Sequence, residues 1–541
     1  MYKRAKKIFE TRQRKDTNNK KEEGPEKDKT YDKIPKSVQN VRERLQEVFS
    51  ECNDFNLRDI VCGNGRINIL IAYIDGLIDK QLLNQHTIMP LTTAIIQENG
   101  EYGRSKIEII KDTVIYNSGV SETDSFENIV KALLSGHAVL FSDGERTALT
   151  MNLKSIKGRA VEDADSERSL RGPRVGFVEN LQLNISLLRQ IIKNPNLKIE
   201  KMVLGEQTNT GIAICYIKNI ANDKIVNEVK GRLNKIKIDA IMESGYIEQF
   251  IEDNRIRFFP MVGNSEKPDK VAAKLLEGRV AILCDGTPFA LTVPFLFIEN
   301  FQASEDYYGN PVYGSIIRIF RLASLLITTC LPALYVALAA FHQTVIPFKL
   351  LLTMAASREG IPFTPFVEAL LMNVCFDLLR EAGIRMPKAI GDAVSIVGAI
   401  VLGQAAVEAG IASAPMVIVT SLTAICSFVV PSLAQVSMIF RYILLTVANL
   451  FGLFGIAIVF VMMFSYLCTK RSFGVPYLSP FAPLNTQDLK DTFIMVPVWA
   501  MFTRPKSLAW GQSDLKAGRV SKPAMEGEEN GNKREKDREK Y

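Results

Sequence analysis

Three polar side chains interrupt an otherwise apolar stretch of this sequence. Asp392, Gln404 and Glu408 lie within it, and Gln404 and Glu408 are one helical turn apart. A carboxylate inside a lipid bilayer costs at least about 2.5 kcal/mol unless it meets water or a partner. If the stretch crosses a membrane, these residues are candidates for lining a cation path, because rings of acidic side chains concentrate cations.

A second interpretation places the two carboxylates at the two surfaces of a membrane. Only fifteen residues separate Asp392 from Glu408, and a helix rises about 1.5 Å per residue. Both side chains could then lie at headgroup level and only mark the ends of a span. The sequence leaves both interpretations open.

The same segment carries small side chains at the spacing of one helical face. Gly391, Ser395, Ala399 and Gly403 follow one another every four residues, which puts them on one side of a helix. Small residues let a second helix approach closely. We therefore predict a helix-packing face.

No pattern in the sequence is typical of a catalytic, cofactor or metal site. The three histidines are isolated and the eight cysteines show no paired spacing, so a zinc site is not expected. The strings typical of P-loop proteins, zinc proteases and serine hydrolases do not occur. We predict a protein without enzymatic activity, catalytic residues, metal or cofactor.

Residues 342–389 mix charged and apolar side chains. Their second half is predicted to form a helix that lies on the membrane or packs inside a bundle, with Pro387 at its end. Asp377 and Arg380, three residues apart, are expected to form a local ion pair. The alternative is that such charges line a vestibule where ions enter.

Long apolar stretches must position these polar residues. Leu322–Phe341 has no charged residue over twenty positions, Ala409–Phe440 none over thirty-two and Ile443–Cys468 none over twenty-six. A bilayer core of about 30 Å needs about 20 apolar residues per helix. We predict an all-α, polytopic membrane bundle over residues 311–470, with four firm crossings and four to six in all.

The charge distribution indicates how the chain is oriented. Residues 1–36 carry thirteen Lys and Arg against seven Asp and Glu, and residues 470–541 carry thirteen against nine. The N-terminal segment lacks the apolar region of a signal peptide. We expect residues 1–45 to be a disordered basic arm and residues 471–541 a basic tail, both on the cytosolic side.

An internal repeat organises the region between the arm and the membrane segment. Leu133–Thr150 aligns without gaps on Leu275–Thr292 with eight identities in eighteen positions, and Ile71–Lys80 answers Ile214–Lys224 at nearly the same offset. Two blocks in the same order indicate a duplication.

Each copy of the repeat is predicted to fold as strand, helix, helix and hairpin. Asp143-Gly144 and Asp285-Gly286 stand between apolar runs, which is a strong hairpin signal. The prediction is a duplicated α/β soluble domain with subdomains at residues 46–158 and 159–310. A cleft between two such lobes could bind a ligand, or the lobes could serve only as a scaffold.

A basic motif marks the boundary between the two copies. Arg171, Gly172, Pro173 and Arg174 form a sequence typical of an exposed turn. Its place between the duplicated units also makes it a candidate hinge or subunit contact.

Several motifs together resemble the A subunit of GerA-type spore germinant receptors. They are the runs Ser169–Leu181, Leu275–Ile282 with Asp285-Gly286, Glu305–Tyr308, Leu378–Lys388 and Ala393–Val407. The resemblance extends from about residue 50 to about residue 500.

The resemblance implies a membrane protein of the inner membrane of the bacterial endospore. It implies a transporter-like B subunit and a lipoprotein C subunit as partners, membrane lipid around the helices, and no nucleic acid. Subunits of this family are thought to form a homo-oligomer that conducts ions, so the expected role is germinant sensing and ion release during germination. A membrane-tethered scaffold and a secondary transporter component without channel activity are the alternatives.

Overall fold

The structure is a computed structural model of the 541-residue chain. The residues it describes are 33–62, 67–93, 106–113, 119–154, 167, 171–253, 258–386, 398, 401–486, 488–497, 500–501, 503–505 and 508. The chain forms two compact units: residues 1–157 with 193–195, and residues 158–192 with 196–541. Each unit contains one five-stranded sheet, and the second also contains the apolar helices.

The two sheets have the same topology. The strands of the first are, in spatial order, β1 (Phe55–Cys62), β2 (Ile67–Ile74), β4 (His137–Ser142), β5 (Ala148–Asn152) and β3 (Val120–Thr123). Those of the second are β6 (Leu197–Leu204), β7 (Thr210–Ile217), β9 (Val280–Cys284), β10 (Ala290–Val293) and β8 (Gly263–Ser265). All neighbours are antiparallel. The chain therefore contains two α/β subdomains of equivalent strand order, which supports the predicted duplication.

Helices cover both faces of each sheet. In the first unit α2 (Val38–Val48) and α6 (Phe126–Leu134) pack on one face, and α4 (Met89–Thr93) and α5 (Lys106–Thr113) on the other. The short α3 (Lys80–Leu83) and the π-helical turn η1 (Asn84–Ile88) lead into α4. Because both faces are buried, β2 is almost entirely apolar instead of alternating.

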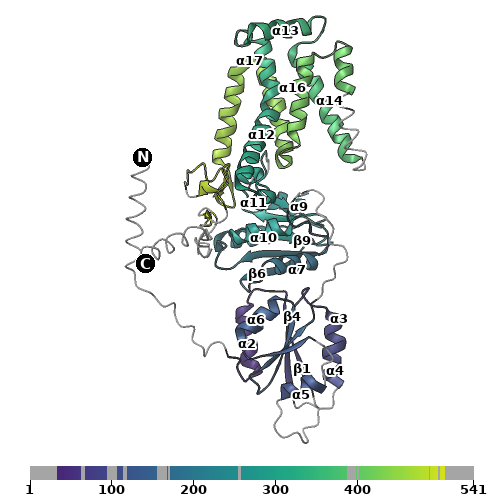
Figure 1. Cartoon of the computed structure of the whole chain (residues 1–541), viewed down its shortest axis with the longest axis vertical. Coiled ribbons are helices and arrows are strands. Elements are labelled where there is room, and N and C mark those ends of the chain that lie inside the picture. The colour runs from purple at the N-terminus through teal and green to yellow at the C-terminus, as the bar shows by residue number, and fades with distance from the viewer. Residues whose placement is uncertain are drawn as a thin grey trace, which may run out of the picture. The chain divides into compact units, whose positions relative to one another are not determined.

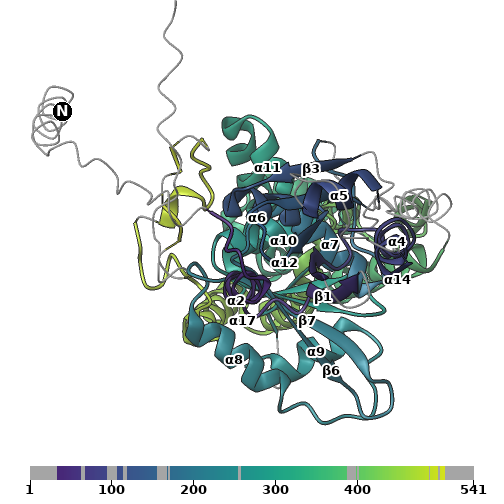
Figure 2. The ribbon, with the colours of Figure 1, turned by 90° about the horizontal axis from the view of Figure 1, so that it is seen from below.

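The second sheet is covered in the same way. Ile212, Ile214 and Tyr216 of β7 pack against α8 (Asp223–Leu233) and α9 (Ser244–Ile251), which lie along the lower edge of Figure 2. The alternate residues Ala213, Cys215 and Ile217 pack against α7 (Leu181–Ile191) and α10 (Pro268–Leu276).

The Asp-Gly pairs of the repeat make equivalent contacts in both subdomains. Asp143 accepts a hydrogen bond from the Val38 amide at the start of α2, and Asp285 accepts one from the Leu181 amide at the start of α7. The glycines that follow, with φ of 88° and 84°, adopt the left-handed turn that favours glycine. The repeated motif thus joins a hairpin to a helix N-terminus.

A set of apolar helices follows the second subdomain (Figure 1). After η2 (Phe297–Phe301) and α11 (Ser304–Tyr308) come α12 (Pro311–Ala340), η3 (Gln343–Val345), α13 (Phe348–Arg358), α14 (Pro365–Arg385), α16 (Ala414–Ser427), η4 (Pro431–Leu433) and α17 (Ala434–Thr469). Residues 401–408 are also helical. Helix α14 packs against α12, α16 and α17, which favours the second of its two predicted placements, packing against other helices, over a position on the membrane surface.

Helix α17 is folded back on itself at Gly452, whose φ of 60° and ψ of −143° are not helical. A Cβ atom at Gly455 would lie 2.8 Å from the Val447 carbonyl oxygen, which cannot happen in one straight helix. Phe440 and Tyr466, from the two arms, both contact the Phe258 ring. The apolar run Ile443–Cys468 is therefore not one span, as its length suggested, but contains the tip of a helical hairpin.

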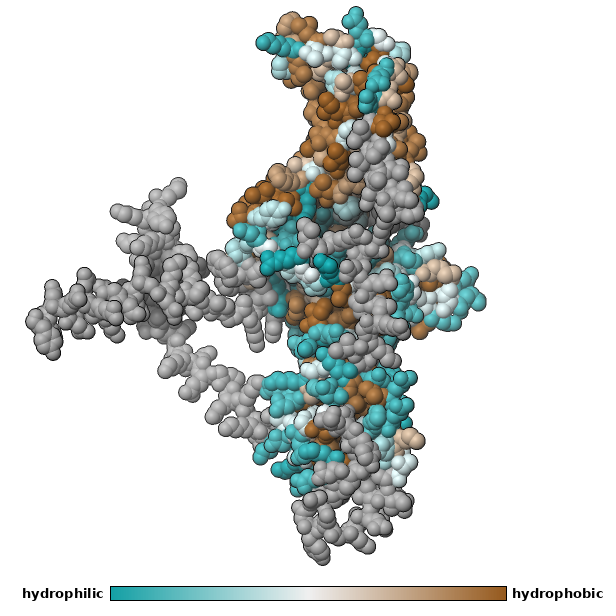
Figure 3. Space-filling view, turned by 45° about the vertical axis from the view of Figure 1, so that its right-hand side comes forward, coloured by the Kyte–Doolittle hydropathy of each residue, from teal (hydrophilic) through white to brown (hydrophobic). Residues whose placement is uncertain are grey.

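Two helical segments among the described residues are long and apolar enough to cross a membrane: Pro311–Ala340 and Pro431–Thr469, the second of which includes the hairpin. Apolar side chains gather on the surface of these helices, whereas the α/β subdomain that precedes them is mostly polar outside (Figure 3). The polytopic bundle with four to six crossings stays a prediction.

The chain returns to the second α/β subdomain after α17. The two-stranded sheet of β11 (Arg471–Ser472) and β12 (Val475–Pro476) is anchored there, because Ser472 donates to the Met261 carbonyl and accepts from the Phe295 amide. Further along, η5 (Asp488–Lys490) follows, and Arg504 donates to the Leu276 carbonyl. The first part of the predicted tail is therefore packed against this subdomain.

Candidate functional site

The predicted polar pair lies on the helical residues 401–408. Gln404 Nε2 donates to Glu408 Oε1 at 2.9 Å, and both side chains are exposed. Glu408 is in the last turn of this helix, shortly before Gly410, whose φ is 66°. Asp392 lies outside the described residues.

The predicted packing face is described at one of its four positions. Gly403 is buried, and a Cβ atom there would lie 3.0 Å from Val417 Cγ1 of α16. Gly391, Ser395 and Ala399 lie outside the described residues. Gly403 thus lies at a close contact between two helices of the same chain.

The partner of Asp377 differs from the predicted one. Its carboxylate accepts from Arg441 Nη2 of α17 at 2.7 and 2.5 Å and from the Tyr442 hydroxyl at 2.5 Å. Arg380 instead lies over the Phe428 ring, 5.6 Å from its centroid. The expected Asp377–Arg380 pair is wrong, because a buried guanidinium from another helix reaches the carboxylate and Arg380 has an aromatic neighbour.

A second buried carboxylate lies where α14 begins. Glu368 accepts from the Ser413 amide at 2.6 Å and from the Ser413 hydroxyl, at the N-terminus of α16. Arg358 Nε lies 3.8 Å from Glu368 Oε2, and the Tyr335 hydroxyl lies 3.3 Å from that of Ser413. Four helices therefore meet at one polar cluster, in which the Glu368 carboxylate accepts from the backbone amide at the start of α16.

A buried ionic network joins the start of α12 to the chain that follows α17. Arg318 is fully buried; its Nε donates to Asp306 at 3.0 Å and its Nη1 to Asp491 at 2.8 Å. Arg321 donates to the same Asp306 at 2.7 Å, and the Tyr307 hydroxyl donates to Asp491 at 2.7 Å. Because each charge is paired, the network can hold α11, α12 and the C-terminal segment together without an isolated buried charge.

Beside this network the second subdomain carries its own buried charges. Glu299 lies 3.1 Å from both Lys274 and Arg279. Burial alone would raise the pKa of Glu299, but the neighbouring cations outweigh it and lower that pKa. Burial raises the pKa of Glu277, which contacts the other side of Arg279.

The boundary motif lies at the surface and contacts α11. Arg171, Gly172, Pro173 and Arg174 are exposed. Gly172 has a φ of 122°, and a Cβ atom there would lie 2.6 Å from the ring of Tyr308. The Tyr308 hydroxyl donates to Asp269 of α10 at 2.5 Å, and burial raises the pKa of this tyrosine. Two motifs that are far apart in the sequence thus meet in space.

Sequence reasoning missed most of these contacts. The buried roles of Arg318, Asp491 and Arg441 depend on long-range pairing that no local spacing reveals, and only the charge of Arg441 between two apolar runs gave a signal. Across the described residues, no group of three or more His, Cys, Asp or Glu side chains is arranged to hold a metal ion. The contacts described above are suited to coupling helices, and they bring together no nucleophile with a base.

The structure combines two α/β subdomains of equivalent topology with apolar helices, including two helical segments among the described residues that are long and apolar enough to cross a membrane. The family model of the Bacillus/Clostridium GerA spore germination protein matches residues 43–507. The chain therefore belongs to the GerA spore germination protein family.

Individual relatives agree with this assignment. Spore germination protein KA of Bacillus subtilis (strain 168) is 43% identical over 492 residues, covering 90% of this chain and 89% of the relative. The uncharacterized membrane protein YfkQ of the same organism is 40% identical over 485 residues, covering 89% and 93%.

One solved structure is also similar, the N-terminal domain of the A subunit of the Bacillus megaterium spore germinant receptor GerK3. It is 34% identical, with a TM-score of 0.40, and covers 49% of this chain and 97% of that chain. The family, the apolar helices and the relative named as a membrane protein support a role in spore germination and membrane association.

Proposed function

We propose that this chain is the membrane subunit of a nutrient germinant receptor, which senses germinants with partner subunits and triggers germination. The observation that carries the proposal is the buried network around Arg318. It ties the first apolar helix to the second α/β subdomain and to the C-terminal segment, so a change in the soluble part can be transmitted to α12.

The proposed mechanism is that several copies assemble into a cation-conducting channel. Gln404 and Glu408 are exposed on a helix of the apolar part and contact each other. In a bilayer such groups need water or a partner outside the chain. A ring of Glu408 side chains around an oligomer axis would line an aqueous path and would attract cations. Asp392 is proposed to belong to the same path.

A scaffold or a secondary transporter component without channel activity is the second candidate. The observation in its favour is that Asp377 and Glu368 both accept hydrogen bonds from partners in the same chain. Such carboxylates hold helices together instead of exchanging ions with water. Glu408, at the end of its helix, is then a headgroup-level residue.

The proposed setting is the inner membrane of the endospore, beside a transporter-like B subunit and a lipoprotein C subunit. Both the N-terminal and the C-terminal regions would lie on the core side. This placement is supported by the contacts of residues 471–508 with the second subdomain, since both ends of the apolar part then lie on one side. The solved relative is itself the N-terminal domain of a receptor A subunit.

The test of the receptor proposal is a strain that lacks this chain. Its spores are exposed to single amino acids and sugars, and the loss of germination with at least one nutrient is expected, with recovery on complementation. Affinity purification of the complemented receptor should recover the two partner subunits. Unchanged germination with every nutrient, together with no recovered partner, contradicts the proposal.

A further inference from the structure

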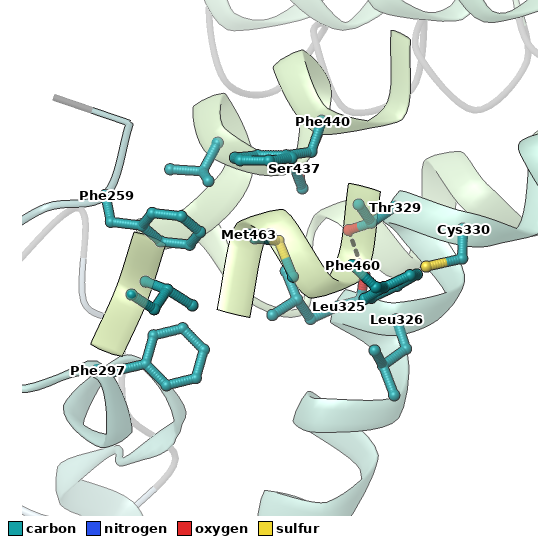
Figure 4. A pocket seen from close by; sticks show the side chains of 12 residues that line it. Phe259, Phe297, Leu325, Leu326, Thr329, Cys330, Ser437, Phe440, Phe460 and Met463 are labelled. Atoms are coloured by element: carbon teal, nitrogen blue, oxygen red, sulfur yellow. Dashed lines mark hydrogen bonds between the residues drawn. The ribbon is translucent and has the colours of Figure 1, made fainter. Parts of the chain in front are cut away.

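An apolar cavity lies where the membrane helices meet the second α/β subdomain (Figure 4). Its volume is about 50 Å³. Helix α12 and both arms of α17 form its walls, and Phe259 and Phe297 close the end next to the subdomain. The cavity therefore lies between α12, α17 and the second subdomain. A movement that passes from the subdomain to the helices would change the relative positions of these three parts.

The two hydroxyls that line the cavity already donate their protons within their own helices. Thr329 Oγ1 donates to the Leu325 carbonyl at 2.7 Å, and Ser437 Oγ donates to the Ala434 carbonyl at 2.9 Å. Both hydroxyls are thus bonded to their own helices, and the rest of the lining is apolar apart from the Cys330 thiol. Cavities of this kind stay dry and take up apolar groups.

The rim of the cavity belongs to the apolar outer surface. Leu326 lines the cavity and is still 47% exposed, and Phe464, next to the lining residue Met463, is 59% exposed. In a bilayer this surface is covered by lipid chains, so the group that meets the opening is an acyl chain.

Two cationic residues follow the end of α17, the helix that forms part of the cavity wall. Lys470 and Arg471 directly follow the arm of α17 whose last buried residue, Leu467, lines the cavity. Cationic side chains at this level suit the phosphate of a lipid headgroup. Apolar lining and adjacent cations together match one end of a phospholipid.

We propose that part of one acyl chain of a membrane phospholipid enters this cavity between α12 and α17, with the lipid headgroup beside Lys470 and Arg471. The bound chain contacts Phe259 and Phe297, so the lipid becomes part of the joint between the membrane helices and the soluble subdomain. The inference rests on the proposed membrane placement of α17.

The test uses tryptophan fluorescence of the full chain in phospholipid bilayers. In a background in which Trp499 and Trp510 are replaced by Phe, Phe460→Trp reports on the cavity and Phe464→Trp on the outer surface. Lipids brominated along the acyl chain quench a tryptophan that they touch. Quenching is expected at both positions.

Filling the cavity separates a bound chain from passing lipid. Ser437→Phe is expected to fill the cavity and to lower the quenching of the tryptophan at position 460, while the quenching at position 464 stays unchanged. The matched Ser437→Ala keeps the cavity open and is expected to leave the quenching at position 460 unchanged. Quenching at 460 that is absent, or that persists in the filled variant, overturns the site. Absence of quenching at 464 as well contradicts the membrane placement itself.

Discussion

At the scale of single residues, the ion pair between Asp377 and Arg441 decides how two helices are joined. Arg441 is almost fully buried, and removing one partner of a buried pair costs about 3–5 kcal/mol because the other charge is left unpaired. We expect Arg441→Leu and Asp377→Leu each to reduce the amount of folded protein in membranes. Their combination should be less harmful than either, because apolar side chains can replace both charges.

Thermal unfolding of the four proteins in detergent measures this coupling. If the melting temperature of the double variant falls by the sum of the two single decreases, the two side chains do not stabilise each other.

Gly172 is the second residue whose identity the geometry requires. Its φ of 122° is costly for any other residue, and a methyl group would meet the Tyr308 ring. We expect Gly172→Ala to destabilise the folded chain by about 1–3 kcal/mol. Gly231→Ala in α8 is the matched control, because a methyl group there meets nothing within 4 Å and alanine favours a helix. The two melting temperatures should shift in opposite directions, and a neutral Gly172→Ala would contradict the contact.

At the scale of elements, the contact at Gly403 explains how closely its helix approaches α16. Gly403→Leu would drive a large side chain into Val417, because a Cβ atom at position 403 would already lie 3.0 Å from Val417 Cγ1. Assembly or germination activity should therefore fall. Val401→Leu is the control, since Val401 is 59% exposed. Equal effects of the two substitutions, measured as receptor abundance and germination rate, would argue against a packing face.

Sequence patterns predicted elements whose apolar residues form a continuous run or one helical face. The repeat pattern predicts strands at residues 67–74 and 211–218 and a helix at residues 124–134, and strand β2, strand β7 and helix α6 match these ranges to within two residues. Strands β1 and β6 were missed because they lie beside only one other strand and carry charged residues such as Arg58 and Glu200. The Gly452 turn was missed because no charge or proline marks it within its apolar run.

The site was predicted less well than the fold. Gln404 and Glu408 could be selected because a charge is unusual in an apolar stretch. The roles of Arg318 and Asp491 could not, because those residues lie 173 positions apart in sequence and meet only in the folded chain.

At the scale of the whole molecule, the return of residues 471–508 to the second subdomain predicts where the tail lies. Ser521→Cys should not react with a membrane-impermeant thiol reagent added outside intact cells or protoplasts. Glu359→Cys, an exposed position in the loop after α13, should react, because the proposed orientation puts an odd number of crossings between it and the tail. Efficient labelling at 521 would overturn that orientation.

The most direct test of the channel proposal is cation release from spores that carry Glu408→Gln. Glutamine has nearly the same size as glutamate and is also tolerated at a membrane surface, but it lacks the negative charge that would attract cations. Glu359→Gln neutralises another exposed carboxylate and serves as the matched control.

Release is recorded after nutrient addition together with the amount of receptor in the inner membrane. If Glu408 side chains line the cation path, cation release from Glu408→Gln spores should be slower at normal receptor abundance. Cation release from Glu359→Gln spores should be unchanged. Normal release from Glu408→Gln spores at normal abundance would contradict the channel and leave Glu408 as a headgroup-level residue.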